Sequence, residues 1–111
     1  MTTRRELLSG IVLLGGLPLA GAVAAKTEPP THSIEIQKMR FGPIPGNIRE
    51  GDRIVWINRD IVAHTATARD GSFDVEVPAG GSATMIAGSA GTTAFYCRYH
   101  PGMRGSLIIS R

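Results

Sequence analysis

The chain has 111 residues, of which 19% are charged, and a formal net charge of +3 at neutral pH. This length fits a single domain, and the mild positive charge is scattered along the chain, which argues against nucleic-acid binding and against a basic membrane-binding face. The one cysteine, Cys97, excludes an internal disulfide, so it is either an inert buried thiol or a group kept for chemistry.

Residues 1–25 have the pattern of an export signal. The twin Arg4 and Arg5 precede an apolar stretch that glycine and proline interrupt, and small residues follow. We expect cleavage after Ala24 or Ala25, and we favour twin-arginine export over general secretory export. The apolar stretch falls short of the ~20 uninterrupted residues that a membrane span requires. The sequence therefore predicts a periplasmic protein without stable membrane association after cleavage.

A short arm is expected between the signal and the domain. Residues 26–32 contain Pro29 and Pro30 and show no apolar period, which predicts a flexible segment. Order is expected to begin near Ser33, so the domain should span residues 33–111. The arm includes the histidine His32, which we leave out of the candidate site for that reason.

The remaining chain predicts short strands. Apolar residues alternate over 33–41 and then slip in phase, which predicts a strand with a bulge or a sharp twist. Residues 51–58 are apolar at both parities, which predicts a central strand covered on both faces. Further runs rich in β-branched and aromatic residues are found at 82–87, 91–97 and 105–110. Turn signals separate these runs, and no segment keeps a helical apolar period over three turns. The fold class predicted is all-β, an antiparallel sandwich or barrel.

Cys97, His100 and Met103 follow one another at three-residue steps in the stretch FYCRYHPGMRG. A set of two histidines, one cysteine and a weak axial methionine suits a copper ion that changes between +1 and +2. The loop lacks one imidazole, and His64 is the candidate for it, because a strand end can present a side chain to the same pole as the loop. Pro101 disfavours helical dihedral angles at His100, so the chain should turn outward there.

Each donor taken alone has a plainer interpretation. Cys97 by itself is typical of a buried core thiol, Met103 of a gap filler, and His64 of a hydrogen-bonded loop histidine. Zinc is disfavoured because thioether is not among its usual ligands, and haem attachment requires a second cysteine. A Cys/His nucleophile pair leaves Met103 idle and offers no obvious third group to orient the histidine. The conjunction of the four donors favours copper.

Three stretches together resemble a known family: GDRIVWINRDIVAHTATA, GTTAFYCRYHPGMRGSLIIS and IEIQKMRFGP. They are similar to the cupredoxins, the small type 1 (blue) copper proteins, and the compact C-x-x-H-x-x-M loop resembles that of the amicyanin branch. The resemblance covers nearly all of residues 33–111. It implies a Greek-key β-sandwich with the metal at one end. The copper ligands that it implies are His64, Cys97, His100 and Met103.

One position departs from the family pattern. Members commonly carry Asn directly after the first histidine, where its amide ties that loop to the cysteine loop. Here the position is Thr65. A hydroxyl is expected to make a similar but smaller bridge, so the departure bears on the reduction potential and leaves the ligand set intact.

The resemblance also implies a function. We expect a monomeric carrier of single electrons between redox proteins, such as a c-type cytochrome and a periplasmic dehydrogenase or oxidase. A copper-binding protein for delivery or tolerance is the alternative, and a structural sandwich with an empty site fits poorly with four donors. An enzyme is not expected, because a filled mononuclear site leaves no position for a substrate.

An electron port is expected at His100, whereas His64 should be covered. The surrounding apolar patch is expected from Met39, Ile44, Pro45 and Pro101, with Arg98 and Arg104 at its rim.

Overall fold

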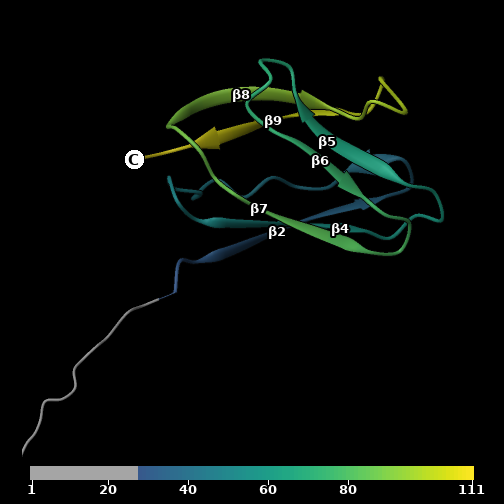
Figure 1. Ribbon diagram of the computed structural model, residues 1–111, viewed down its shortest axis with the longest axis horizontal. Helices are drawn as coiled ribbons and strands as arrows, with labels where there is room; N and C mark the ends of the chain where they lie inside the picture. Colours follow the sequence, from purple (N-terminus) through teal and green to yellow (C-terminus); the bar gives the residue numbers. More distant parts are fainter. Residues whose placement is uncertain (1–27) are drawn as a thin grey trace, which may run out of the picture.

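The computed structural model describes residues 28–111, which form two four-stranded β-sheets packed face to face (Figure 1). The first sheet contains β2 (Thr31–Gln37), β3 (Arg40–Phe41), β4 (Arg53–Asn58) and β7 (Ser82–Ile86), in the order β3-β2-β4-β7. The second contains β5 (His64–Ala68), β6 (Asp74–Val77), β8 (Gly91–Tyr96) and β9 (Arg104–Ile109), in the order β6-β5-β8-β9. β2 and β4 are parallel, and the other neighbours are antiparallel.

The all-β sandwich predicted from the sequence is confirmed, since residues 28–111 contain strands and turns but no helix. Within that part of the chain, a helix long and apolar enough to cross a membrane is therefore absent. The expected export signal, residues 1–25, lies outside the described residues, as does the start of the expected arm.

A tight hairpin follows β2, in place of the bulged strand predicted for residues 33–41. β3 turns back on β2 and places Phe41 opposite Ile36. The two turn residues, Lys38 and Met39, have φ angles of 55° and 59°, as in the type I′ turns that join hairpin strands. Neither is Gly, Asn or Asp, so the sequence carries no signal for this turn. The apolar pattern changes phase here because the chain passes from β2 to β3.

β4 is a central strand, as predicted, but only one of its faces is fully buried. Ile54, Trp56 and Asn58 are buried, whereas the alternate residues are half-buried. The prediction of coverage on both faces was wrong because the second sheet covers the inner face alone, and the outer face of such a sandwich remains partly solvated.

The core between the sheets is built around aromatic rings. Trp56 of β4 packs edge-to-face against Phe95 of β8, with ring centroids 5.2 Å apart, and Phe41 packs against the same ring at 4.8 Å. Burying each such ring stabilises the fold by about 1.5–3 kcal/mol. β9 approaches Phe95 so closely that a Cβ at Gly105 would lie 2.7 Å from its ring. The contacts of Phe41 and Trp56 with Phe95 join the two sheets near the end of β8.

The first strand begins at Thr31, earlier than the boundary expected at Ser33. His32 is therefore not part of a flexible arm. It is buried in β2, and its Nε2 lies 2.8 Å from the Oδ2 atom of Asp52. The parallel pairing of Thr31 with Arg53 extends β2 over these residues, and such pairing leaves no mark in the sequence of the arm.

Candidate metal centre

The sheet topology brings the two halves of the predicted site to one end of the sandwich. His64 is the first residue of β5, and Cys97 follows the last residue of β8. These strands are antiparallel, with Thr67 opposite Tyr96. The start of β5 and the end of β8 therefore lie together, at the right-hand end of Figure 1.

Three of the four predicted ligands converge on one point. The Nδ1 atoms of His64 and His100 each lie 3.8 Å from Sγ of Cys97. One donor atom from each of the three residues lies within 4.8 Å of the others. His64 and Cys97 are fully buried, whereas His100 is partly exposed. This burial agrees with the expectation that the first imidazole is covered and the second approaches solvent.

Met103 lies at the end of the same loop and is buried with Cys97 in the core cluster. The backbone N–H of Cys97 donates to the carbonyl of Met103 at 3.0 Å, and the N–H of Met103 donates to the carbonyl of His100 at 2.8 Å. These bonds close the loop into a β-turn with Pro101 at its second position. Gly102 has no positive φ, so this turn does not depend on the conformational freedom of glycine. The thioether of Met103 remains a proposed ligand.

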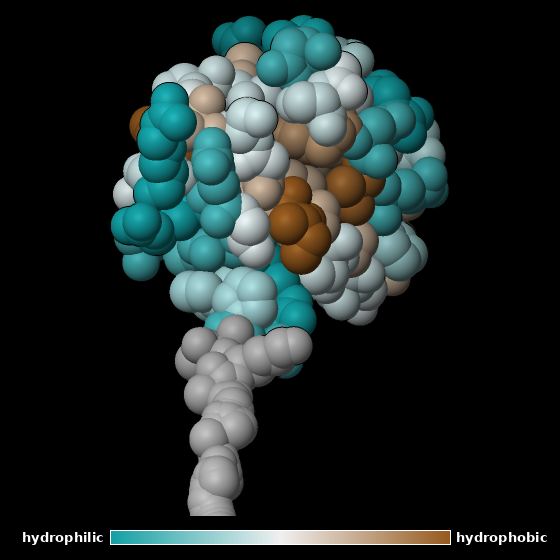
Figure 2. Space-filling view, turned by 60° about the vertical axis from the view of Figure 1, so that its left-hand side comes forward, coloured by the Kyte–Doolittle hydropathy of each residue, from teal (hydrophilic) through white to brown (hydrophobic). Residues whose placement is uncertain are grey.

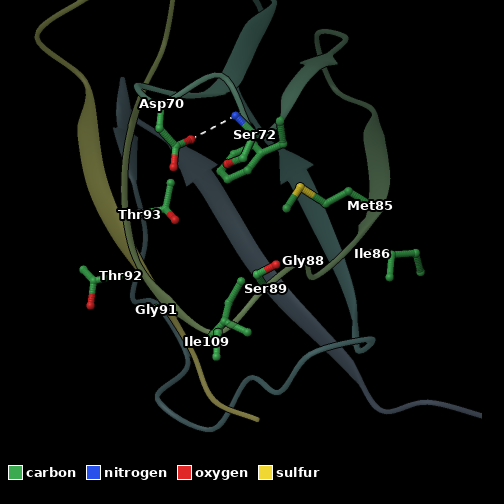
Figure 3. A pocket seen from close by; sticks show the side chains of 12 residues that line it. Asp70, Ser72, Met85, Ile86, Gly88, Ser89, Gly91, Thr92, Thr93 and Ile109 are labelled. Carbon is green, nitrogen blue, oxygen red and sulfur yellow. Dashed lines mark hydrogen bonds between the residues drawn. The ribbon is translucent and has the colours of Figure 1, made fainter.

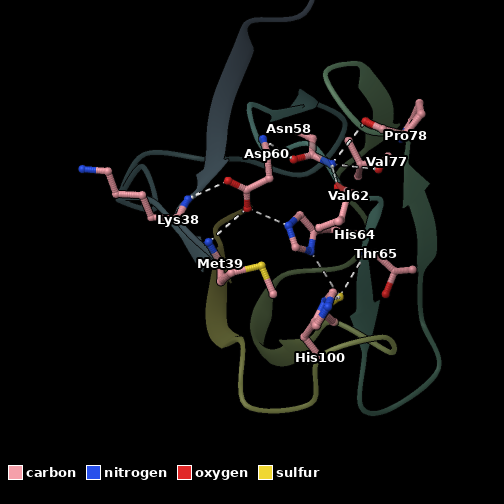
Figure 4. Close-up of polar contacts among 11 residues, drawn as sticks. Lys38, Met39, Asn58, Asp60, Val62, His64, Thr65, Val77, Pro78 and His100 are labelled. Carbon is pink, nitrogen blue, oxygen red and sulfur yellow. Dashed lines mark hydrogen bonds and ion pairs between the residues drawn. The ribbon is translucent and has the colours of Figure 1, made fainter.

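Asp60 orients the buried imidazole, and the sequence analysis missed it. Its Oδ2 lies 2.7 Å from Nε2 of His64 (Figure 4). The opposite ring nitrogen, Nδ1, therefore faces Cys97. Burial by itself would raise the pKa of Asp60, but hydrogen bonds from His64 and from the N–H groups of Met39 and Lys38 outweigh it and hold the pKa below its usual value. Such outer partners fix the ring orientation of metal-binding histidines.

The same carboxylate stabilises the unusual hairpin turn. The N–H groups of Lys38 and Met39 donate to Asp60 at 2.7 and 3.0 Å. Asp60 itself is held by Asn58, whose Oδ1 accepts its N–H at 2.9 Å and whose Nδ2 donates to the carbonyl of Val62 at 2.8 Å. The only sequence signal for this role of Asp60 was its position four residues before the candidate ligand His64. Its partners Lys38 and Met39 are remote in the chain.

Thr65 makes the bridge that its hydroxyl was expected to make. Its Oγ1 accepts the N–H of Arg98 at 2.8 Å, and its own N–H donates to Sγ of Cys97 at 3.4 Å. The hydroxyl also lies 2.9 Å from that of Thr67, which donates to Asp74 at 2.8 Å. The β5 strand and the cysteine loop are thus joined beside the sulfur atom.

The surface near His100 is partly apolar. Met39 is 41% exposed, and Pro101 is exposed beside the imidazole. Ile44 is partly buried against the core, so it adds little exposed area. The sequence analysis missed Ile61, which is 95% exposed in the loop before His64.

The predicted rim arginines have different surroundings. Arg98 is engaged by Asp74, with Nε 3.1 Å from the carboxylate. Arg104 is exposed, and with Arg40 and Met39 it lines a cavity of about 270 Å³ beside the loop. Arg40 was not foreseen, because the hairpin that carries it to this end was not predicted.

The donor set fits a copper ion better than the alternatives weighed above. Two imidazole nitrogens face one cysteine sulfur, which also accepts the backbone N–H of Thr65. Met103, which is buried and belongs to the same loop, offers a thioether sulfur as a further soft donor. Soft sulfur with two imidazoles is the ligand chemistry of mononuclear type 1 copper sites.

Comparisons with known proteins agree with this arrangement. A family model described as the cupredoxin-like domain matches residues 10–109. Amicyanin-alpha of Methylorubrum extorquens is 29% identical over 98 residues, which cover 81% of this chain and 82% of that protein. Amicyanin of Paracoccus denitrificans is 25% identical over an alignment that covers 97% of this chain and 96% of that protein.

A solved structure resembles the fold as well. The crystal structure of amicyanin from Paracoccus versutus superposes with a TM-score of 0.61 at 22% identity, covering 72% of this chain and 81% of that chain. This likeness supports the two-sheet sandwich.

Proposed function

The chain belongs to the cupredoxin-like family, and from this premise we propose that it is a blue copper protein that carries single electrons between redox proteins. The observation that carries the proposal is the convergence of both Nδ1 atoms, 3.8 Å from Sγ of Cys97. The proposed ligands are His64, Cys97 and His100, with Met103 as the weak axial donor. The copper ion supplies a one-electron couple between Cu(I) and Cu(II).

The protein contributes a rigid and dry set of donors. His64 is fixed by Asp60 on its outer side, and Cys97 is fixed by the N–H of Thr65. Both residues are fully buried, so water has no access from their side. Little has to move when one electron arrives or leaves, which favours outer-sphere transfer. Four donors leave no position for a substrate, so the proposal includes no enzymatic reaction.

His100 is the proposed electron port, because it is the one imidazole of the pair that reaches solvent. The docking face consists of His100 with the exposed side chains of Met39 and Pro101. A small apolar contact of this kind suits a weak, short-lived complex with a redox partner. A c-type cytochrome and a periplasmic dehydrogenase or oxidase are the proposed partners. The periplasmic location itself rests on the signal pattern of residues 1–25.

The test is an absorption spectrum of the copper-loaded protein. Binding of Cu(II) is expected to give an intense visible band from thiolate-to-copper charge transfer, and Cys97→Ser should abolish it. A matched control is Ser106→Ala on β9, which leaves all donors in place and should keep the band. A wild-type protein that binds Cu(II) and stays colourless would show that the blue-copper proposal is wrong.

Metal retention separates an electron carrier from a copper-delivery protein. Because His64 and Cys97 are completely buried, release of the ion requires the loop to open. We therefore expect repeated oxidation and reduction without loss of copper, even when a Cu(I) chelator is present. Rapid transfer of Cu(I) to the chelator would favour the delivery function.

A further inference from the structure

A hollow with two arginines on its walls lies beside the metal end of the sandwich. The residues that line this cavity of about 270 Å³ are Met39, Arg40, Phe41, Gly102, Met103 and Arg104. Arg40 belongs to β3 of the first sheet, and Arg104 begins β9 of the second. Contacts between these two strands bring the arginines together. Each sheet thus contributes one cation to a single cavity, which we call the arginine hollow.

The fold does not neutralise either guanidinium group of the hollow. Arg53, Arg59 and Arg98 each pair with a carboxylate, at distances of 2.6, 3.0 and 3.1 Å. Within residues 28–111, Arg40 and Arg104 have no such partner, and both side chains are exposed. Among the same residues, none with a carboxylate lines the hollow. The two positive charges are therefore free to bind a ligand.

The metal-end loop adds an unused backbone donor to the hollow. Gly102 is the third residue of the turn in which the N–H of Met103 donates to the carbonyl of His100. The N–H of Gly102 itself donates to no group in the described part of the chain. Asp60, the carboxylate that contacts the hairpin beside the hollow, is engaged by the N–H groups of the Lys38–Met39 turn. The donors of the hollow therefore have no acceptor of their own.

The cavity at the opposite end of the sandwich has a different character. It also has a volume of about 270 Å³, but among the described residues that line it Asp70 is acidic and none is basic (Figure 3). Met85 and Ile86 form an apolar side of this cavity, and Ile86 is 58% exposed. Figure 2, in which this end comes forward, shows hydrophobic atoms gathered on the face. The excess of positive charge is therefore particular to the arginine hollow.

We propose that the arginine hollow is a binding site for a small dissolved oxyanion, such as inorganic phosphate. A guanidinium group presents paired N–H donors that match the oxygen atoms of an oxyanion, and such charge-assisted bonds are stronger than neutral ones. The N–H of Gly102 offers a further donor between the two cations. The cavity has room for one such ion together with some of its water. Because both arginines are exposed, we expect a dissociation constant of about 1 mM.

The position of the hollow links the oxyanion to the candidate metal centre, a step that rests on the proposed function. Met103, the proposed axial donor, forms part of the wall of the hollow. A negative charge held there stabilises Cu(II) more than Cu(I), because Cu(II) carries the larger positive charge. The oxidised protein should therefore bind the oxyanion about threefold more tightly than the reduced protein. By the same linkage, the bound oxyanion lowers the reduction potential.

The test is a titration of the full chain with sodium phosphate from about 0.1 to about 20 mM, with sodium chloride keeping the ionic strength constant. Nuclear magnetic resonance follows the side-chain Nε–H signals of the arginines and the backbone N–H signals. Saturable shifts are expected for Arg40, Arg104 and Gly102, whereas Ser89, beside the other cavity, should not shift. This measurement requires no copper, so its outcome does not depend on the blue-copper proposal.

Three variants with one positive charge fewer show where the oxyanion binds. Arg40→Gln and Arg104→Gln should each weaken phosphate binding about tenfold. Arg49→Gln changes an exposed side chain paired through its backbone with Ser110, beyond the far end of β9, and should leave binding unchanged.

Two sets of outcomes decide between the site and its link to copper. Shifts that do not saturate, that chloride alone reproduces, or that persist unchanged in both hollow variants would overturn the site. In the copper-loaded protein, phosphate should lower the reduction potential of the wild type and of Arg49→Gln, but not of Arg40→Gln or Arg104→Gln. An unchanged wild-type potential at saturating phosphate would overturn the link to copper. A chain that binds phosphate but takes up no copper would contradict the proposed function and leave the oxyanion site standing.

Discussion

The hydroxyl of Thr65 accepts the backbone N–H of Arg98 at 2.8 Å, and this bond joins the strand that begins with His64 to the loop that begins with Cys97. Both donors are held in the relative position that the site needs. The bond therefore contributes to stability and to the geometry of the site together.

Replacing Thr65 by valine should lower the stability of the fold and disturb the geometry of the site. Thr65→Val keeps the side-chain shape but leaves the N–H of Arg98 without its partner, so the free energy of unfolding should fall by about 1–3 kcal/mol. Thr65→Ser retains the hydroxyl and should lie closer to the wild type. Denaturant unfolding of the copper-free protein measures the first effect, and voltammetry of the loaded protein measures the shift in reduction potential. Equal stability of the two variants would contradict the role of the bridge.

Met103 is predicted to act as a weak axial donor. Met103→Leu conserves volume in a buried position, so stability should change by less than about 1.5 kcal/mol. Copper and colour should persist, while the reduction potential rises because a donor to Cu(II) is lost. Voltammetry and the visible spectrum provide the measurement. Loss of all copper would instead identify Met103 as a strong ligand or as a residue that the loop requires.

Electron exchange is predicted to depend on the surface beside His100. Pro101→Glu adds a charge that must be desolvated when a partner docks, and should slow partner oxidation by roughly tenfold. Ser89→Glu adds the same charge in the loop before β8, at the opposite end from Cys97, and should have little effect. Stopped-flow rates are compared with the visible band as a check on the site. Unchanged rates with an intact band would remove His100 as the port.

Acid stability is predicted to depend on Asp52, far from the donor cluster. Hydrogen bonds from His32 and from the N–H of Arg49 hold the pKa of Asp52 below its usual value. The ionised carboxylate therefore stabilises the fold above the unfolded-state pKa of about 3.9, and this contribution is lost as pH falls through the lower folded-state pKa.

Asp52→Asn should lower the free energy of unfolding at neutral pH, and the difference from wild type should shrink below pH ~4. Glu28→Gln alters an exposed carboxylate paired with Arg53 and should change stability by less than about 1 kcal/mol. Denaturant unfolding between pH ~3 and ~7 gives the comparison. A wild-type to Asp52→Asn difference that stays constant over this range would contradict the prediction.

The sequence by itself determined the all-β class and the short loop that holds three of the proposed donors. Cys97, His100 and Met103 lie in one short loop, so their spacing already limits how they can be arranged. Regular turn signals and short apolar runs predicted the strands well, because both depend on neighbouring residues. The partly exposed His100 and the covered His64 were predicted from the residues that flank each of them.

Only the tertiary structure decided which remote groups complete the site. Asp60 reaches His64 and the left-handed Lys38–Met39 turn together, although the turn lies more than twenty residues away. The burial of His32 depends on the parallel pairing of β2 with β4. Strand order and backbone hydrogen bonds join residues distant in the chain, and local periodicity carries no record of them.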